Sequence, residues 1–368
     1  MASSDDPPTL GVEEEFLLVD PDSGAPVPQN RAVAERAAAD GVDLQLELTS
    51  CQVETTSSVV ETTTDLRDEL LRLRTVAAGA AEACGARLLA VGLPPTLPAQ
   101  FPVTDTPRYR DIGERFGMIA HEQGICGAHV HVAVPDRDAA IAVSNRLRPW
   151  LPLLLALTAN SAIYRNDDTG HCSWRSVLWA RWPSAGPPPH FDSADEYDAA
   201  VSLLCRSGVI RDDGMIYWDV RPSRNFPTVE VRVADVPATV SETVVFAALV
   251  RACVMTALEE HRRGEPVLPL APFALKAAYW KAARDGLDGD SLDLESHSAS
   301  PARSLLERLV SVVRPALEQC GDHELVTAGL ARVGETGNGA MRQRWAWQRR
   351  QDVDDVLEAA AAATLERP

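Results

Sequence analysis

Apolar and polar side chains alternate along several short segments of the chain, a pattern that predicts β-strands. The clearest case is 128–134, where histidine and valine alternate with a period of two. Further strands are predicted at 10–20, 42–57 and 86–92, and a hairpin is predicted from 216–221 and 228–235.

Helical spacing of apolar residues fills most of the sequence between and after these strands. The predicted helices cover 64–84, 111–122, 136–160, 241–263, 271–285, 301–319 and 349–366. The helix at 136–160 should bend near Pro149 and Pro152, because proline cannot continue the helical hydrogen-bond ladder. Residues 164–191 are expected to form a long irregular stretch that is ordered by its aromatic side chains.

Strands separated by helices, with mixed connections, favour an α+β fold with a largely antiparallel sheet. The sequence contains no internal repeat and no linker that divides it. We therefore expect a single domain over residues 9–368, preceded by a disordered N-terminus at 1–8.

The composition narrows the range of partners. With a formal charge of −18, the chain is not expected to bind nucleic acid, because such binding relies on clustered cations. The longest apolar stretch, 150–159, is too short to cross a bilayer, and no signal peptide is visible. Seven cysteines without a C-x-x-C pair indicate free thiols in a reducing cytoplasm. We expect a soluble cytoplasmic protein that acts on small molecules, and a homo-oligomer is compatible with this sequence.

Glu13 and Glu15 begin the candidate chemistry. They share one face of the strand at 10–20, because successive strand side chains point to opposite faces. Carboxylates grouped on an inward face repel each other and lose hydration, which is tolerable mainly around a cation. The alternative is a solvated strand face that binds nothing.

Glu47 and Glu54 lie seven positions apart, so a continuous strand would place them on opposite faces. Both can reach one site only if a bulge or turn near Ser50 resets the alternation. We predict such an irregularity.

His129 and His131 share a face of the strand at 128–134. An H-x-H pair is moderately specific for a metal, and the alternative is two histidines that are hydrogen-bonded locally. Combined with carboxylates, the pair indicates Mg²⁺ or Mn²⁺ rather than zinc.

Glu230 and Arg232 share a face of the strand at 228–235. They could form a structural ion pair, or Glu230 could bind a metal while Arg232 contacts a phosphoryl oxygen, whose geometry matches the guanidinium fork. Antiparallel pairing in the hairpin is expected to set Asp219 near Glu230. Arg221 could hold a substrate carboxylate with both arms of its fork.

In their order and spacing, these motifs resemble those of the type 2 glutamate–cysteine ligases, the YbdK-type carboxylate–amine ligases of bacteria. The resemblance is carried by GVEEEF, LELTSCQVETTS, GAHVHVAV, NDDTGHCSWRSVLWARWPSAGPPP, YWDVRPSRNFPTVEVRVADVP and GNGAMRQR. It implies a fold similar to the catalytic domain of glutamine synthetase, in which helices back a curved, largely antiparallel sheet.

The resemblance also implies an ATP-dependent reaction with Mg²⁺, or Mn²⁺, as cofactor. The γ-carboxylate of glutamate would attack ATP to give an acyl phosphate, and the amine of cysteine would displace phosphate to form γ-glutamylcysteine. Catalytic roles fall on Arg232 and Glu54. The implied metal ligands are Glu13, Glu15, Glu47, Glu54, His129 and Glu230. The implied contacts to substrate or phosphate are Arg175, Arg221, Arg232 and His131.

Three other functions stay open on the sequence alone. One is a ligase of the same mechanism that uses a different amine, and another is a metal-dependent amidohydrolase, suggested by the H-x-H pair. The third is a catalytically silent binding protein. The absence of a G-x-S-x-G motif suits phosphoryl transfer, which needs positioning and charge neutralisation rather than a protein nucleophile.

Overall fold

A seven-stranded sheet forms the centre of the fold in the computed structural model, which describes residues 6–98, 101–122 and 124–366. Its strands are β1 (Leu10–Val19), β2 (Gln45–Leu46), β3 (Gln52–Thr56), β4 (Arg87–Leu89), β5 (Gly127–Ala133), β8 (Val220–Pro222) and β9 (Thr228–Asp235). They follow the order β2-β3-β1-β5-β9-β8, and β4 pairs with β1. Every pairing between these strands is antiparallel.

Helices and two small strand pairs make up the rest of the structure. The strand pairs are β6 (Ile163–Tyr164) with β7 (Asp167–Asp168), and β10 (Asp290–Asp293) with β11 (Ser298–Pro301). The first helices are α1 (Asn30–Ala39), α2 (Thr63–Ala83), α3 (Pro107–Phe116), α4 (Met118–His121), α5 (Arg137–Leu147), α6 (Leu151–Thr158), α7 (Trp174–Trp179) and α8 (Ala194–Arg206). A 3-10 turn, η1 (Asp213–Met215), is followed by α9 (Val240–Arg262), α10 (Pro272–Asp285), α11 (Ala302–Cys320), α12 (His323–Thr336), α13 (Gly339–Arg350) and α14 (Val353–Thr364).

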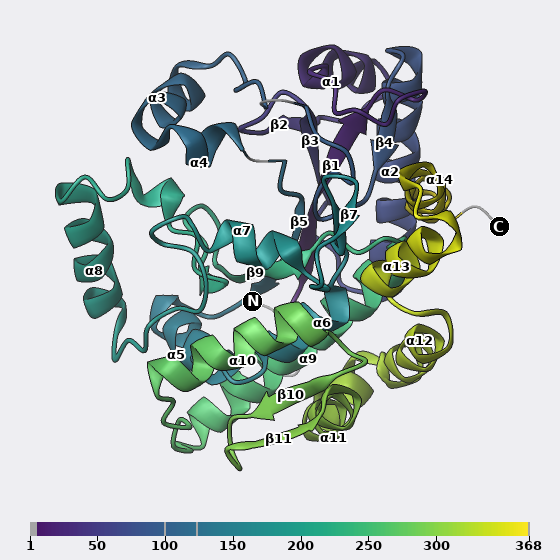
Figure 1. Cartoon of the computed structure of the whole chain (residues 1–368). Helices are drawn as coiled ribbons and strands as arrows, with labels where there is room; N and C mark the ends of the chain where they lie inside the picture. The colour runs from purple at the N-terminus through teal and green to yellow at the C-terminus, as the bar shows by residue number, and fades with distance from the viewer. Residues whose placement is uncertain (1–5, 99–100, 123, 367–368) are drawn as a thin grey trace.

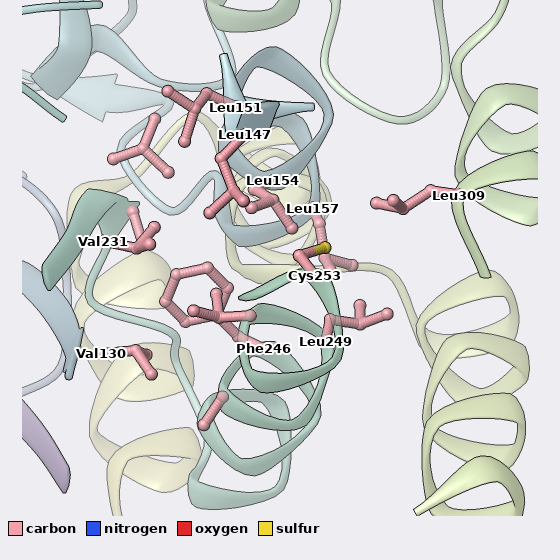
Figure 2. Close-up of a cluster of buried hydrophobic side chains, with 14 of the residues drawn as sticks. Val130, Leu147, Leu151, Leu154, Leu157, Val231, Phe246, Leu249, Cys253 and Leu309 are labelled. Atoms are coloured by element: carbon pink, nitrogen blue, oxygen red, sulfur yellow. The ribbon is translucent and has the colours of Figure 1, made fainter. Parts of the chain in front are cut away.

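The two faces of the sheet differ in character. Val130 and Val231 point to one face and pack in a buried cluster with Phe246 and Leu249 of α9 (Figure 2). Removing each such side chain from water stabilises the fold by roughly 1.5–3 kcal/mol. Because side chains alternate along each strand, the other face receives Glu13 and Glu15 of β1 and His129 and His131 of β5.

Helix α9 is the centre of this core. Among the described residues it is the one helix that is long and apolar enough to cross a membrane by length and composition. However, 78% of its most apolar window is buried inside the fold. Its length and apolar character therefore reflect its place under the sheet.

An aromatic cluster forms a separate layer of the structure. Its buried members are Trp182, Phe191, Tyr197 and Trp218. The ring centroids of Phe191, Tyr197 and Trp218 lie 5.3–5.4 Å from one another. In Figure 1 the nearby α3, α4 and α8 lie on the side of the molecule away from α13 and α14. This layer supplies one wall of the cavity described below.

The predicted fold class, α+β with a largely antiparallel sheet, is confirmed. The predicted irregularity near Ser50 is also confirmed: a turn at residues 50–51 separates β2 from β3, which then pair with each other. The helix expected to bend at 136–160 is divided into α5 and α6. Asp136 caps α5, and Pro152 lies in the first turn of α6.

Several sequence predictions were wrong in detail. Helices α1, α8 and α12 were not predicted, the stretch 164–191 contains α7, and the end of the chain forms α13 and α14 rather than one helix. The hairpin register differs by two residues: Arg221, not Asp219, lies opposite Glu230. Of the N-terminus expected to be disordered, residues 1–5 lie outside the described residues.

Candidate active site

A cavity of about 690 Å³ lies on the polar face of the sheet. All the site residues expected from the sequence line it: Glu13, Glu15, Glu47, Glu54, His129, His131, Arg175, Arg221, Glu230 and Arg232. They come from segments up to 219 positions apart in the chain, so only the tertiary fold brings them together.

Strand register explains the convergence. Glu13 lies opposite His129 across the β1–β5 pair, and Glu15 lies opposite Glu54 across the β1–β3 pair. His131 lies opposite Glu230 across the β5–β9 pair. Residues that are directly opposite in an antiparallel pair share a face, so these side chains all reach the cavity.

Glu13 links the two histidines. Its Oε2 lies 2.9 Å from His129 Nδ1, and its Oε1 lies 3.4 Å from His131 Nε2. Burial raises the pKa of Glu13, but the hydrogen bonds and charges of His129 and His131 outweigh burial and lower it overall. The other ring nitrogen of His131, Nδ1, lies 3.1 Å from the hydroxyl of Thr228, which orients the ring.

Glu15, Glu47 and Glu54 form a second group of carboxylates. Burial, followed by the charge of Glu15, raises the pKa of Glu47 to about 8. Burial, followed by the charge of Glu47, raises the pKa of Glu54 well above its ordinary value. The backbone N–H of Gly127 donates to Glu15 Oε2 at 2.7 Å and holds that side chain in place.

Glu230 is held by two arginines. Arg221 donates from Nε and Nη2 to its two carboxylate oxygens at 2.8 and 3.2 Å, and Arg232 donates from Nη1 to Oε1 at 2.6 Å. Burial raises the pKa of Glu230, but the two arginine charges outweigh it and lower the pKa overall. The fork of Arg221, expected to hold a substrate carboxylate, is occupied by Glu230 in this structure.

The donor set fits a divalent cation. Three groups each bring ligand atoms within 4.8 Å of one another: Glu13 with Glu54 and His129, Glu13 with His131 and Glu230, and Glu15 with Glu47 and Glu54. Carboxylate oxygens with imidazole nitrogens suit Mg²⁺ or Mn²⁺. The raised pKa values of Glu47 and Glu54 show that these carboxylates are costly to ionise together without a compensating positive charge.

Sequence reasoning missed other residues of the cavity wall. Arg108 and Tyr109 reach the cavity from α3, where the Tyr109 hydroxyl donates to the Leu46 carbonyl at 3.0 Å. Trp179 and Tyr217 lie beside the arginines, with the guanidinium of Arg232 5.7 Å from the Tyr217 ring centre. Trp179 and Tyr217 lie within motif segments quoted above, whereas Arg108 and Tyr109 lie outside them and are identified only by their place in the fold.

Comparison with known proteins agrees with this geometry. The model of glutamate–cysteine ligase family 2 matches residues 9–362. A relative from Mycolicibacterium vanbaalenii, named as a candidate glutamate–cysteine ligase 2-2, is 79% identical over 98% of this chain and 99% of its own length. A relative from Mycolicibacterium smegmatis, named as a candidate glutamate–cysteine ligase 2-3, is 68% identical over 97% of this chain and 98% of its own length.

A solved structure with the same fold is that of glutamate–cysteine ligase from Francisella tularensis in complex with AMP. The TM-score is 0.71 at 14% sequence identity, and the match covers 98% of this chain and 89% of that one. The family match and these relatives together show that the protein is a ligase. The chain belongs to the glutamate–cysteine ligase family 2.

Proposed function

We propose that this protein is an ATP-dependent carboxylate–amine ligase that joins the γ-carboxylate of L-glutamate to the amine of L-cysteine. The observation that carries the proposal is the cavity itself, where three groups of metal-ligand atoms lie beside two arginines. Family membership and the likeness to an AMP-bound ligase support ATP as the second substrate.

The carboxylates and His129 would hold Mg²⁺ or Mn²⁺. The set comprises Glu13, Glu15, Glu47, Glu54, His129 and Glu230. The bound metal would supply positive charge to the triphosphate. The chain has only two lysines, so lysine side chains cannot provide this charge. Of this set, Glu54 is proposed to be catalytic as well, because it belongs to two of the three groups of ligand atoms.

The reaction divides a difficult amide synthesis into two displacements. A γ-carboxylate oxygen of glutamate attacks the terminal phosphorus of ATP, and the bond to the ADP oxygen breaks. The amine then attacks the acyl carbon, phosphate leaves, and the amine loses a proton. Arg232 is proposed to stabilise the transferred phosphoryl group, a role supported by its buried guanidinium and its position lining the cavity from β9.

The remaining polar groups are proposed to hold the substrates. Arg175 is the better candidate for a substrate carboxylate, because the fork of Arg221 is occupied by Glu230. His131 is proposed to contact substrate or phosphate. We further propose that residues 9–368 act as one catalytic domain in the cytoplasm, and that any assembly is a homo-oligomer.

An assay of phosphate release tests the proposal. Purified protein is incubated with ATP, Mg²⁺, glutamate and a panel of amines that includes cysteine, and products are identified by mass spectrometry. We expect ADP and phosphate to form in equal amounts with γ-glutamylcysteine. Turnover with another amine and not with cysteine would show that cysteine is not the acceptor. Hydrolysis of amides without ATP would favour the amidohydrolase function instead.

A further inference from the structure

Asp235, the last residue of β9, is fully buried beside the cavity and accepts several hydrogen bonds. Its Oδ2 accepts from the backbone N–H of Asn160 at 2.8 Å and from the Ser161 hydroxyl at 2.7 Å. Its Oδ1 accepts from the Ser173 hydroxyl at 2.8 Å. Arg175 Nη1 lies 3.7 Å from the same oxygen, Oδ1. One carboxylate therefore joins three separate stretches of chain.

A β-bulge explains why this side chain faces the site. Between Ala128 and Val130 the β5–β9 register shifts by one residue, so that β9 carries one extra residue. Beyond the bulge, Asp235 pairs with Gly127. Gly127 alternates with His129 along β5, so Asp235 lies on the cavity face of the sheet.

The two serines that donate to Asp235 also hold the start of α7, the helix that carries Arg175. The Ser161 hydroxyl accepts from the backbone N–H of Arg175 at 3.0 Å. The Ser173 hydroxyl caps α7 by accepting from the Ser176 N–H at 3.2 Å. Asp235 thus restrains Arg175 both through its backbone and through its charge.

The guanidinium of Arg175 is closely confined. The residue is 3% exposed, and a Cβ added to Gly127 would lie 2.4 Å from Arg175 Nη2, so only glycine leaves room there. Its Nη1 donates to the Val233 carbonyl at 3.5 Å, and its Nε has no hydrogen-bond partner within the described part of the chain. A buried donor without a partner is costly, so this guanidinium has unused hydrogen-bonding capacity. Arg175 also lines the cavity, where a ligand carboxylate would bind.

We propose that Asp235 is a positioning residue that fixes Arg175 for recognition of the substrate carboxylate. The inference rests on the proposed function and deepens it by assigning Arg175, rather than Arg221, to substrate. Burial raises the pKa of Asp235, and the charge of Arg175 is the largest influence that opposes this rise. The two groups are therefore electrostatically coupled.

Asp235→Asn is the informative variant because asparagine has nearly the shape of aspartate but only one acceptor oxygen. The fixed N–H of Asn160 requires that oxygen at the Oδ2 position. The amide NH₂ must then face Ser173 and Arg175, and it would repel the guanidinium. We expect Arg175 to move and the KM for glutamate to rise by at least about tenfold, in line with loss of a charged hydrogen bond.

A rise in KM that is confined to glutamate would distinguish a positioning role from a general loss of protein structure. The dissociation constant of an ATP analogue with Mg²⁺, measured by calorimetry, should change less than about twofold, and kcat should fall less than KM rises. The matched control is Asp322→Asn. Asp322 is also buried and accepts from a hydroxyl, that of Thr63, and from an arginine, Arg251, but its partners, unlike Arg175, do not line the cavity. This control should lower stability without altering the KM for glutamate.

A second variant, Ser161→Ala, tests the same inference if Asp235→Asn does not fold. Ser161→Ala removes the hydroxyl that joins Asp235 to the Arg175 backbone, and it should raise the KM for glutamate in the same direction by a smaller factor. The inference is overturned if both variants keep the wild-type KM, or if Asp322→Asn raises it equally.

Crystal structures of wild type and Asp235→Asn give a readout that is independent of activity. A displaced Arg175 guanidinium supports positioning, and an unmoved one overturns it. If the wild-type protein turns over no pairing of glutamate and amine, the proposed function fails, whereas the position of Arg175 in the variant still decides the role of Asp235.

Discussion

Glu13 and His129 lie directly opposite each other on β1 and β5, with Glu13 Oε2 2.9 Å from His129 Nδ1. The second carboxylate oxygen of Glu13 faces His131 at 3.4 Å. Glu13 belongs to two of the three groups of metal-ligand atoms, so it connects the group that contains His129 with the group that contains His131.

Glu13→Gln is therefore expected to weaken binding of the metal–nucleotide complex by at least about tenfold and nearly to abolish turnover. The amide retains the shape of the side chain but loses its charge. Calorimetry with an ATP analogue and Mg²⁺ measures the first effect, and ADP release measures the second. Glu318→Gln, which removes only an exposed ion pair with Arg314, is the control. Wild-type activity in Glu13→Gln would remove Glu13 from the site.

Most residues of the candidate site could be grouped from the sequence because they lie on strands. The two-residue period assigns each side chain to a face, so the sequence alone groups Glu13 with Glu15, and His129 with His131. The odd spacing of Glu47 and Glu54 was informative too, since it required the turn that the structure shows at residues 50–51.

Other features depend on tertiary contacts. In the β8–β9 hairpin Arg221 rather than Asp219 lies opposite Glu230. A shift of two residues keeps every side chain on its face, so the apolar pattern does not distinguish the two registers. The bulge that turns Asp235 toward the site was not predicted, although Asp235 breaks the alternation of Val229, Val231 and Val233. Helices such as α3 contribute to the site only because the fold places them over the cavity.

Divalent cations should stabilise the folded protein. Glu15, Glu47 and Glu54 repel one another, and a cation that binds only the folded state raises the free energy of unfolding. We expect Mg²⁺ or Mn²⁺ to raise the Tm measured by calorimetry, with a concentration dependence that reports the Kd. Glu54→Gln should raise the Tm of the metal-free protein and reduce the further rise caused by Mg²⁺. An equal Mg²⁺ effect in wild type and variant would contradict metal binding by Glu54.

Asp219 predicts a specific dependence of stability on pH. Burial raises its pKa to about 6, although the charge of Arg175 opposes the rise. Because the folded-state pKa exceeds the ordinary value of 3.8, ionisation of Asp219 disfavours the folded state above pH 6. As the pH falls from 6 to 4, protonation in the folded state removes this cost.

Asp219→Asn cannot ionise, so its stability relative to wild type should decline as the pH falls through this window. The expected decline is about 1.4 kcal/mol per pH unit between pH 6 and pH 4. Urea unfolding in the presence of a chelator measures it. A pH-independent difference for Asp219→Asn would show that Asp219 does not titrate in this range.

Arg232→Lys tests the role of a guanidinium at the phosphoryl group. Arg232 donates to Glu230 at 2.6 Å while its guanidinium lies 5.7 Å from the Tyr217 ring centre, so its plane is fixed from two sides. Lysine keeps the charge but lacks the planar fork of a guanidinium. It therefore cannot hold Glu230 and contact a phosphoryl oxygen at the same time. We expect kcat to fall by roughly 10²–10³-fold, the usual cost of losing one donor to a developing charge, with a smaller change in nucleotide Kd.

Rapid-quench measurement of ADP formation isolates the phosphoryl-transfer step. Arg314→Lys on the exposed surface of α11 should leave that rate unchanged, and an unchanged rate in Arg232→Lys itself would rule out a phosphate contact by Arg232.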